Sequence, residues 1–201
     1  RQFFSTQGWT ALDDHRVPRA VDMERQGMPP SEVMLSELLK KRGYATAVIG
    51  KWHLGAGVQA LPTERGFDHQ YGFYDAFSLY GAADDPDMIG VRGEYFTDRY
   101  QWWRGRSGGS AIRRDGTVID EDGYLTTRIA EEAIEWITAH RAGPFFAYIP
   151  FSAPHAPMQA PRKYVDRFAH IERADQRVYY GMIAALDDAV GAILASLADL
   201  H

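Results

Sequence analysis

The chain has 201 residues, of which 45% are apolar and 24% are charged, and its formal net charge is −5. These fractions are typical of a globular protein with a substantial core, and they exclude the disordered and fibrous classes. The negative charge argues against nucleic-acid binding, and the absence of cysteine excludes a disulfide framework, a thiolate metal site and a cysteine nucleophile within these residues.

The first predicted elements are a helix and a strand, which follow an irregular segment over residues 1–30. Ser31 is a suitable N-cap for a helix that runs to Arg42, with apolar positions 34, 35, 38 and 39 on one face. Gly43 provides the stop, and residues 44–49 form a short apolar run typical of a buried strand. Residues 31–74 are therefore predicted to contain a first αβ unit.

The middle of the chain, residues 75–123, is dense in glycine, aromatic and acidic residues without a sustained period, which predicts a loop-rich insertion. Short strand-like runs occur near residues 95–99 and 117–119. Aromatic rings stack on sugars and arginine binds sulfate, so the insertion could line a sugar-sulfate cleft, although a packed surface subdomain fits equally well. The side chains concerned are Tyr80, Tyr95, Trp102, Trp103, Arg104 and Arg106.

A second αβ unit is predicted within residues 124–201. Residues 124–141 have the period of an amphipathic helix, and residues 145–149 form a second buried strand. A long helix then covers residues 174–197, and we expect no stretch that spans a membrane. The predicted inner face of this helix consists of Val178, Met182, Ile183, Leu186, Val190, Ile193, Leu194 and Leu197.

This order of elements predicts one α/β domain over residues 1–201, built on an open, mostly parallel sheet flanked by helices. In such sheets, ligands bind beyond the carboxyl ends of the strands. Lys51 and His53 follow the first predicted strand, and His155 follows the second. On an extended backbone, residues 51 and 53 would point to the same side. A cation and two imidazoles in one crevice suit an anionic substrate and proton transfer.

Other interpretations of these residues stay open or are excluded. A single lysine or histidine in a loop is most commonly just solvated or hydrogen-bonded locally. Gly50-Lys51 lacks the glycine spacing and the following Ser or Thr of a phosphate-binding loop. The acidic pairs at 13–14, 84–85 and 187–188 are not assigned to a metal, so we predict no metal ligand within this chain.

Several long stretches of the chain resemble the sulfatase family. Residues 43–55, GYATAVIGKWHLG, resemble the second hallmark of that family. Residues 65–73, 144–157 and 180–191 are similar to later family stretches and occur in the same order. The likeness covers most of residues 31–197.

The resemblance implies an alkaline-phosphatase-like α/β sheet and the hydrolysis of sulfate esters. The family uses a formylglycine nucleophile, made from Cys or Ser in a C/S-x-P-x-R motif, and a Ca²⁺ ion that polarises the sulfate. By this resemblance, Lys51 binds the sulfate and the formylglycine hydrate, and His53 later takes a proton from that hydrate. His155 binds the sulfate and helps to protonate the departing alcohol.

The chain departs from the family in lacking any C/S-x-P-x-R motif. We therefore expect an internal segment of a sulfatase catalytic domain, with the formylglycine upstream and the Ca²⁺ ligands outside the segment. We expect the 201-residue chain alone to be inactive. The alternatives are an inactive sulfate- or glycan-binding remnant and a phosphate or phosphonate ester hydrolase of the same superfamily.

The family also gives expectations about partners and location. It implies that the substrate is a sulfated small molecule or a sulfated glycan, and that the protein is periplasmic, secreted or lysosomal. The sequence leaves the particular ester and the oligomeric state open.

Overall fold

The main sheet has five strands in the order β5-β4-β2-β1-β6, in a computed structural model that describes residues 27–93 and 96–200. β1 (Ala45–Lys51) lies between β2 (His69–Phe73) and β6 (Phe145–Tyr148) and is parallel to both. β4 (Arg113–Arg114) and β5 (Thr117–Val118) form an antiparallel hairpin on the outer side of β2. The predicted α/β class, with parallel strands at its centre, is confirmed.

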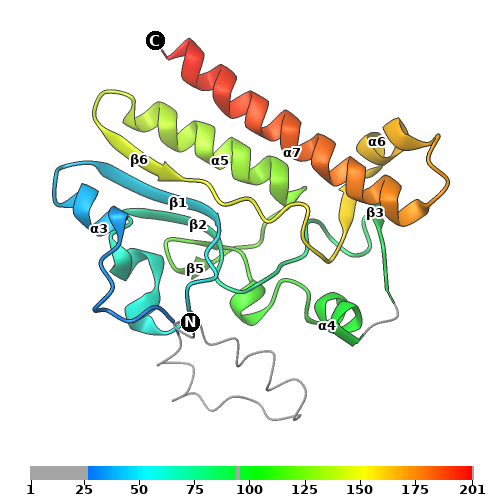
Figure 1. The fold of residues 1–201 in the computed structure, drawn as a ribbon, viewed down its shortest axis with the longest axis horizontal. Coiled ribbons are helices and arrows are strands. Elements are labelled where there is room, and N and C mark those ends of the chain that lie inside the picture. The colour runs from blue at the N-terminus through cyan, green and yellow to red at the C-terminus, as the bar shows by residue number, and fades with distance from the viewer. Residues whose placement is uncertain (1–26, 94–95, 201) are drawn as a thin grey trace.

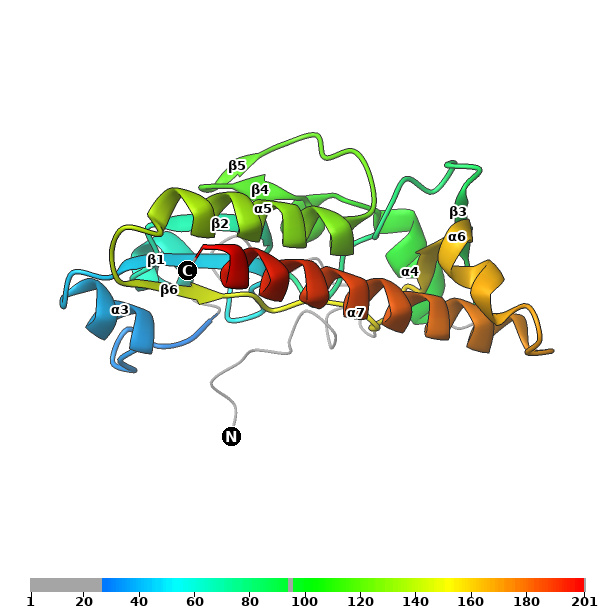
Figure 2. The ribbon, with the colours of Figure 1, turned by 90° about the horizontal axis from the view of Figure 1, so that it is seen from above.

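Helices cover the sheet in layers. α5 (Leu125–His140) packs on the sheet, and α7 (Ala174–Asp199) runs along α5 (Figures 1 and 2). Ala47 and Ile49 of β1 join the main core, which these two helices cover. Val48 belongs to a smaller cluster with Trp52 and Phe67. β1 contributes side chains to both clusters and is therefore buried on both faces, which explains its continuous apolar run.

The first helix is shorter than the sequence predicts, because the segment before it is bound elsewhere. α3 (Leu35–Lys40) begins four residues after Ser31, and the backbone N–H of Met34 donates to Glu37 Oε2 at 2.8 Å. Arg65, only 2% exposed, donates to the carbonyls of Met28 and Glu32. These carbonyls therefore serve a buried guanidinium instead of a first helical turn.

The predicted apolar face of α3 is partly wrong. Leu35 and Leu38 are exposed, while Ser36 is buried and donates to the carbonyl of Arg65 at 2.6 Å. The predicted stop is confirmed, since Gly43 has φ of 83° and its N–H donates to the carbonyl of Lys40 at 3.0 Å.

Residues 75–123 contain more regular structure than expected. The predicted strand near 95–99 is wrong, because α4 (Phe96–Arg104) is a helix there, and Tyr95 lies outside the described residues. β3 (Met88–Gly90) pairs with β7 (Gln159–Pro161), just before the short helix α6 (Arg162–Val165). The strand predicted near 117–119 corresponds to β5.

The inner face of α7 also differs from the prediction. Ile183, Val190 and Leu194 are exposed. The buried side is made of Val178, Gly181, Met182, Ala185, Ala189 and Ile193. Small residues let another element approach closely, as Gly181 shows where it lies against Val165 of α6. Of the predicted face, Val178, Met182 and Ile193 are buried, and small residues take the remaining buried positions.

The expectation that no stretch could span a membrane needs a correction. Among the residues that the structure describes, α7 is long and apolar enough to do so by length and composition. One such helix is weak evidence for a span, because core helices pass the same test. Here α7 packs along α5 and shares its core.

A buried ion network ties α5 to the sheet at the end opposite the carboxyl edge. Glu132 of α5 is 9% exposed and lies 3.0 Å from His69 Nε2 and 3.1 Å from Arg114 Nε. Burial alone would raise the pKa of Glu132, but the bonds from His69 and Arg114 outweigh it and lower the pKa to about 2. The ionised carboxylate therefore stabilises the fold.

Replacing Glu132 with glutamine should lower the free energy of unfolding by roughly 1–2 kcal/mol near neutral pH, because the half-exposed Arg114 loses its charged partner. The stabilisation by Glu132 is complete above its ordinary pKa of 4.5 and is lost as the pH falls toward 2. Urea unfolding near neutral pH and at about pH 3 should show the difference between the proteins shrinking at the lower pH. The exposed neighbour Glu131→Gln is the control, and an equal loss in both variants would contradict the assignment.

Candidate active site

The site begins where the parallel strands end. Lys51 is the last residue of β1, and its N–H donates to the carbonyl of Pro150 at 2.8 Å. On the other side, the N–H of Trp52 donates to Phe73 at 2.9 Å and the N–H of His53 donates to Tyr74 at 3.0 Å. The chain leaving β1 is thus held between the exits of β6 and β2.

Two glycines allow these exits to approach closely. A Cβ on Gly50 would lie 2.3 Å from the carbonyl oxygen of Pro150, and one on Gly72 would lie 2.0 Å from the carbonyl oxygen of Gly50. Both glycines also have positive φ angles, of 138° and 125°. Side chains are therefore excluded at both positions, on steric and conformational grounds.

Lys51 and His53 lie at this edge in different settings. Lys51 is half-buried, whereas His53 is exposed. His53 adopts a left-handed φ of 53°, so the expectation of an extended backbone through residue 53 is wrong. Among the residues that the structure describes, neither the Lys51 ammonium nor the His53 ring has a hydrogen-bond or ion-pair partner.

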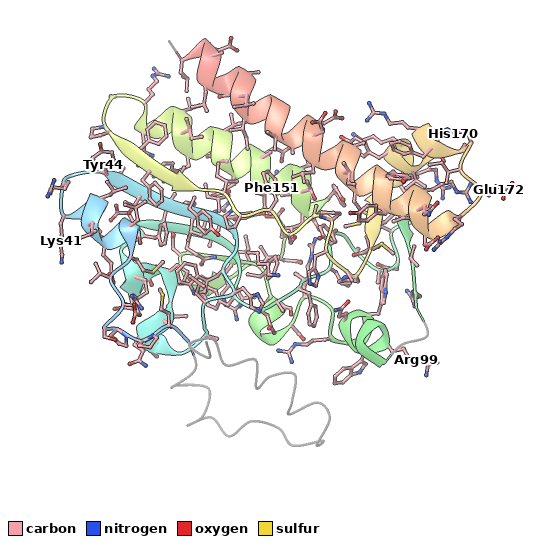
Figure 3. The ribbon with its side chains drawn as sticks, in the orientation of Figure 1. Lys41, Tyr44, Arg99, Phe151, His170 and Glu172 are labelled. Carbon is pink, nitrogen blue, oxygen red and sulfur yellow. The ribbon has the colours of Figure 1, made fainter. Side chains whose placement is uncertain are left out.

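His155 is held on the loop that follows β6. The hydroxyl of Tyr80 donates to the carbonyl of His155 at 3.0 Å, and the N–H of His155 donates to Ser152 at 2.9 Å. The ring Nδ1 lies 2.5 Å from the carbonyl of Ala156, an acceptor, so Nδ1 carries a proton. Nε2 is then the nitrogen left to accept or deliver a proton. Figure 3 shows Phe151, where this loop begins.

The charges of these residues act on one another. Burial lowers the pKa of Lys51, and nearby Asp75 partly opposes this shift. Partial loss of hydration is the largest cause that lowers the pKa of His53. The charges of Lys51 and His155 lower this pKa further, whereas the charge of Asp75 raises it. Since Lys51 and His155 both affect His53, the three side chains share one electrostatic environment. His53 is consequently neutral near pH 7 and can accept a proton.

Asp75 is a member of this environment that sequence reasoning missed. It follows β2, and its N–H donates to the carbonyl of Gly109 at 3.0 Å. Its Oδ2 lies 3.7 Å from Arg104 at the end of α4. No local pattern marks Asp75, because only the tertiary fold brings it near Lys51.

The arrangement can bind an anion and move protons. Within residues 27–93 and 96–200, no group of three or more His, Asp or Glu side chains is placed to hold a metal ion. Asp84 and Asp85 lie in a turn, Asp188 pairs with Arg167 at 3.6 Å, and Asp13-Asp14 lies outside the described residues. Two surface cavities, of about 620 and 310 Å³, are lined by other residues than Lys51, His53 and His155.

Comparison with known proteins assigns a family to this chain. The model of the sulfatase family matches residues 6–201. Human N-acetylgalactosamine-6-sulfatase is 33% identical over 178 residues, which is 87% of this chain and 31% of that protein. Arylsulfatase from Klebsiella aerogenes is 32% identical over 156 residues, which is 76% of this chain and 30% of that protein.

A solved structure is similar as well. Ps i-CgsB, crystallised with k-i-k-neocarrahexaose, superposes with a TM-score of 0.72 and 28% identity, over 87% of this chain and 38% of that one. The chain thus spans about a third of the length of the proteins that it matches.

Gly72→Ala should disturb this edge by forcing Gly50 away. We expect a loss of at least about 3 kcal/mol in the free energy of unfolding, measured by urea denaturation. Gly116→Ala is the matched control, because Gly116 also has a positive φ of 83° but no atom within 4 Å of its Cβ position. Equal losses in the two variants would show that backbone strain, and not the close approach, limits position 72.

Asp75→Asn should lower the pKa of His53 further, because it removes the negative charge that opposes the other shifts. NMR titration of the histidine ring protons measures this change directly. Asp84→Asn, in an exposed turn, removes the same charge away from the site and should leave the His53 titration unchanged. An unchanged His53 in Asp75→Asn would rule out the coupling.

Proposed function

Because this chain belongs to the sulfatase family, we propose that Lys51, His53 and His155 form part of an active site that hydrolyses sulfate esters. The observation that carries the proposal is the meeting of one cation and two imidazoles at the carboxyl edge of an alkaline-phosphatase-like sheet. Of the three groups, Lys51 and His155 are proposed to bind the substrate sulfate.

Lys51 suits the binding of a sulfate oxygen. Its half-buried ammonium has no counter-ion in direct contact among the described residues, and a partly dehydrated cation binds an anion more strongly than a fully solvated one. Binding an anion would also reverse the shift that burial imposes on the Lys51 pKa.

The two histidines suit opposite proton transfers. His53, with its lowered pKa, is neutral near pH 7 and accepts a proton from a hydroxyl at the reacting centre. His155 holds its Nδ1 proton against the carbonyl of Ala156, so a second proton on Nε2 can pass to the alkoxide oxygen that leaves. The carbonyl contact fixes the ring orientation for that transfer.

The calcium ion and formylglycine implied by the family are not part of this assignment. The described residues provide no fitting metal site, and the sequence has neither a cysteine nor the S-x-P-x-R motif. Both groups stay predictions, and we assign no step to them.

The substrate is proposed to be a sulfated carbohydrate. The names of the similar proteins include an amino-sugar sulfatase, and Ps i-CgsB was solved with a hexaose. A periplasmic, secreted or lysosomal location is the corresponding proposal, since the relatives come from animals and bacteria.

Binding of 4-nitrophenyl sulfate to the purified chain tests the site. In an NMR titration, the ring protons of His53 and His155 should shift together and report the same Kd. Lys51→Ala should weaken binding by about tenfold or more, because a charged hydrogen bond is lost. His155→Ala should weaken it to a smaller degree.

Matched controls remove the same groups elsewhere. Lys41→Ala removes an equal charge beyond the amino end of β1, and His170→Ala removes an exposed imidazole beyond α6 (Figure 3). Neither should change the Kd. Binding that is equally weakened by Lys41→Ala, or unchanged by Lys51→Ala, would contradict the proposed site.

A further inference from the structure

We propose, on the basis of the sulfatase function above, that the cavity beside α4 is a second subsite that binds an anionic sugar unit of a longer glycan. This cavity, of about 310 Å³, is lined by Arg92, Gly93, Arg99, Trp102 and Trp103. We name it the α4 subsite. It contains two aromatic faces for stacking and two guanidinium groups for sulfate.

Trp102 provides a fixed wall of the α4 subsite. Its Nε1–H donates to the carbonyl of Val91 at 3.3 Å, and its ring lies over Gly90, where a Cβ would be 2.6 Å away. The guanidinium of Arg92 lies 4.6 Å from the ring centroid. The aromatic face is therefore oriented before any ligand arrives, which lowers the entropy cost of binding.

Trp103 provides an exposed surface. Its side chain is 80% exposed, which is unusual for so large an apolar surface. A sugar ring stacked on Trp103 would remove this surface from water. An exposed tryptophan beside a tryptophan of fixed orientation is typical of a surface that binds carbohydrate.

The charges of the lining favour an anionic sugar over a neutral one. Arg92 and Arg99 are both exposed, and none of the lining residues that the structure describes is acidic. Figure 3 shows Arg99 on the outer side of α4. The larger cavity of about 620 Å³ offers a contrast, because its two arginines are offset by Asp120, Glu121 and Asp122. We therefore expect an anion to bind in the α4 subsite and not in the larger cavity.

The α4 subsite is joined to the active-site edge by two routes. β3, which carries Gly90 under Trp102, pairs with Gln159 of β7 shortly after the His155 loop. Arg104, at the end of α4, contacts Asp75, whose charge acts on Lys51 and His53. The first route is a pair of hydrogen-bonded strands and the second is an ion pair, so we infer that one extended ligand can engage both places. The subsite should thus favour oligosaccharides over monosaccharides.

The test compares a long and a short ligand on the purified chain. The probes are sulfated maltohexaose, unsulfated maltohexaose and glucose 6-sulfate, with Kd measured by isothermal titration calorimetry. Trp103→Ala should weaken binding of the sulfated hexaose by about fivefold, through lost stacking. Arg99→Gln should weaken it by about tenfold, through a lost charged hydrogen bond. Neither variant should change the Kd of glucose 6-sulfate, and the unsulfated hexaose should bind poorly to all proteins.

Matched variants keep the result interpretable. Trp103→Phe retains an aromatic face and should restore most of the affinity, and Arg42→Gln removes an exposed charge at the end of α3 without effect. Unchanged binding of the sulfated hexaose in both Trp103→Ala and Arg99→Gln would overturn the subsite. So would an equal loss for glucose 6-sulfate, or no binding of the hexaose to the unmodified chain.

A different variant, Lys51→Ala, tests the proposed function separately from the α4 subsite. Lys51→Ala should weaken both sulfated ligands, because it acts at the reacting centre. If it weakens neither while Trp103→Ala still weakens the hexaose, the sulfate-binding role of Lys51 fails and the α4 subsite stands as a glycan site.

Discussion

The active-site edge depends on the close packing of backbone at Gly50, Gly72 and Pro150. Because no side chain separates these residues, the exits of β2, β1 and β6 are in contact, and each exit delivers a different group. β1 brings Lys51 and His53, β2 leads to Asp75, and β6 leads to the His155 loop. A wider spacing of the strands would leave each charge solvated by itself. The mutual effects on the His53 pKa therefore follow from a steric property of two glycines.

A second group of family-like residues stabilises the fold and takes no part in this chemistry. Arg65 is buried and donates to backbone carbonyls before α3, and Gly66 has a φ of 82° where a Cβ would lie 2.5 Å from Glu37 N. Phe67 packs edge-on against Trp52 at 5.8 Å, and Asp68 accepts from Thr46 at 2.9 Å. The same stretch thus fixes the start of β1. A match to such a stretch identifies the family through the fold, whereas the proposed chemistry would rest on Lys51, His53 and His155.

The sequence predicts those parts of the fold whose cause is local. Gly43 ends α3 and the apolar runs form β1 and β6, because the turn preference and the apolar pattern lie within a few residues. Only β1 is buried as predicted, since β6 is the edge strand of the sheet and none of its residues is buried. The start of α3 could not be predicted, since a guanidinium more than thirty residues away at Arg65 takes the carbonyls before it. The packed face of α7 was predicted only in part: Val178, Met182 and Ile193 are buried as expected, but small residues complete the face. Lys51, His53 and His155 are predicted from their positions after strands, whereas Asp75 becomes a neighbour only when the turn at Gly109 folds against it.

The position of Asp75 bears on how strongly the proposed site would bind an anion. Dehydration lowers the pKa of Lys51 and of His53 because it disfavours their charged forms. A nearby negative charge stabilises those charged forms. Asp75 supplies part of that charge before any ligand binds, and its own charge is shared with Arg104. Asp75 is not in direct contact with Lys51, but its charge already stabilises the ammonium, so an anion would gain less from Lys51 than it would without Asp75. The proposed hydrolysis would release a free sulfate ion, and this product would leave slowly if it were bound by an unopposed cation.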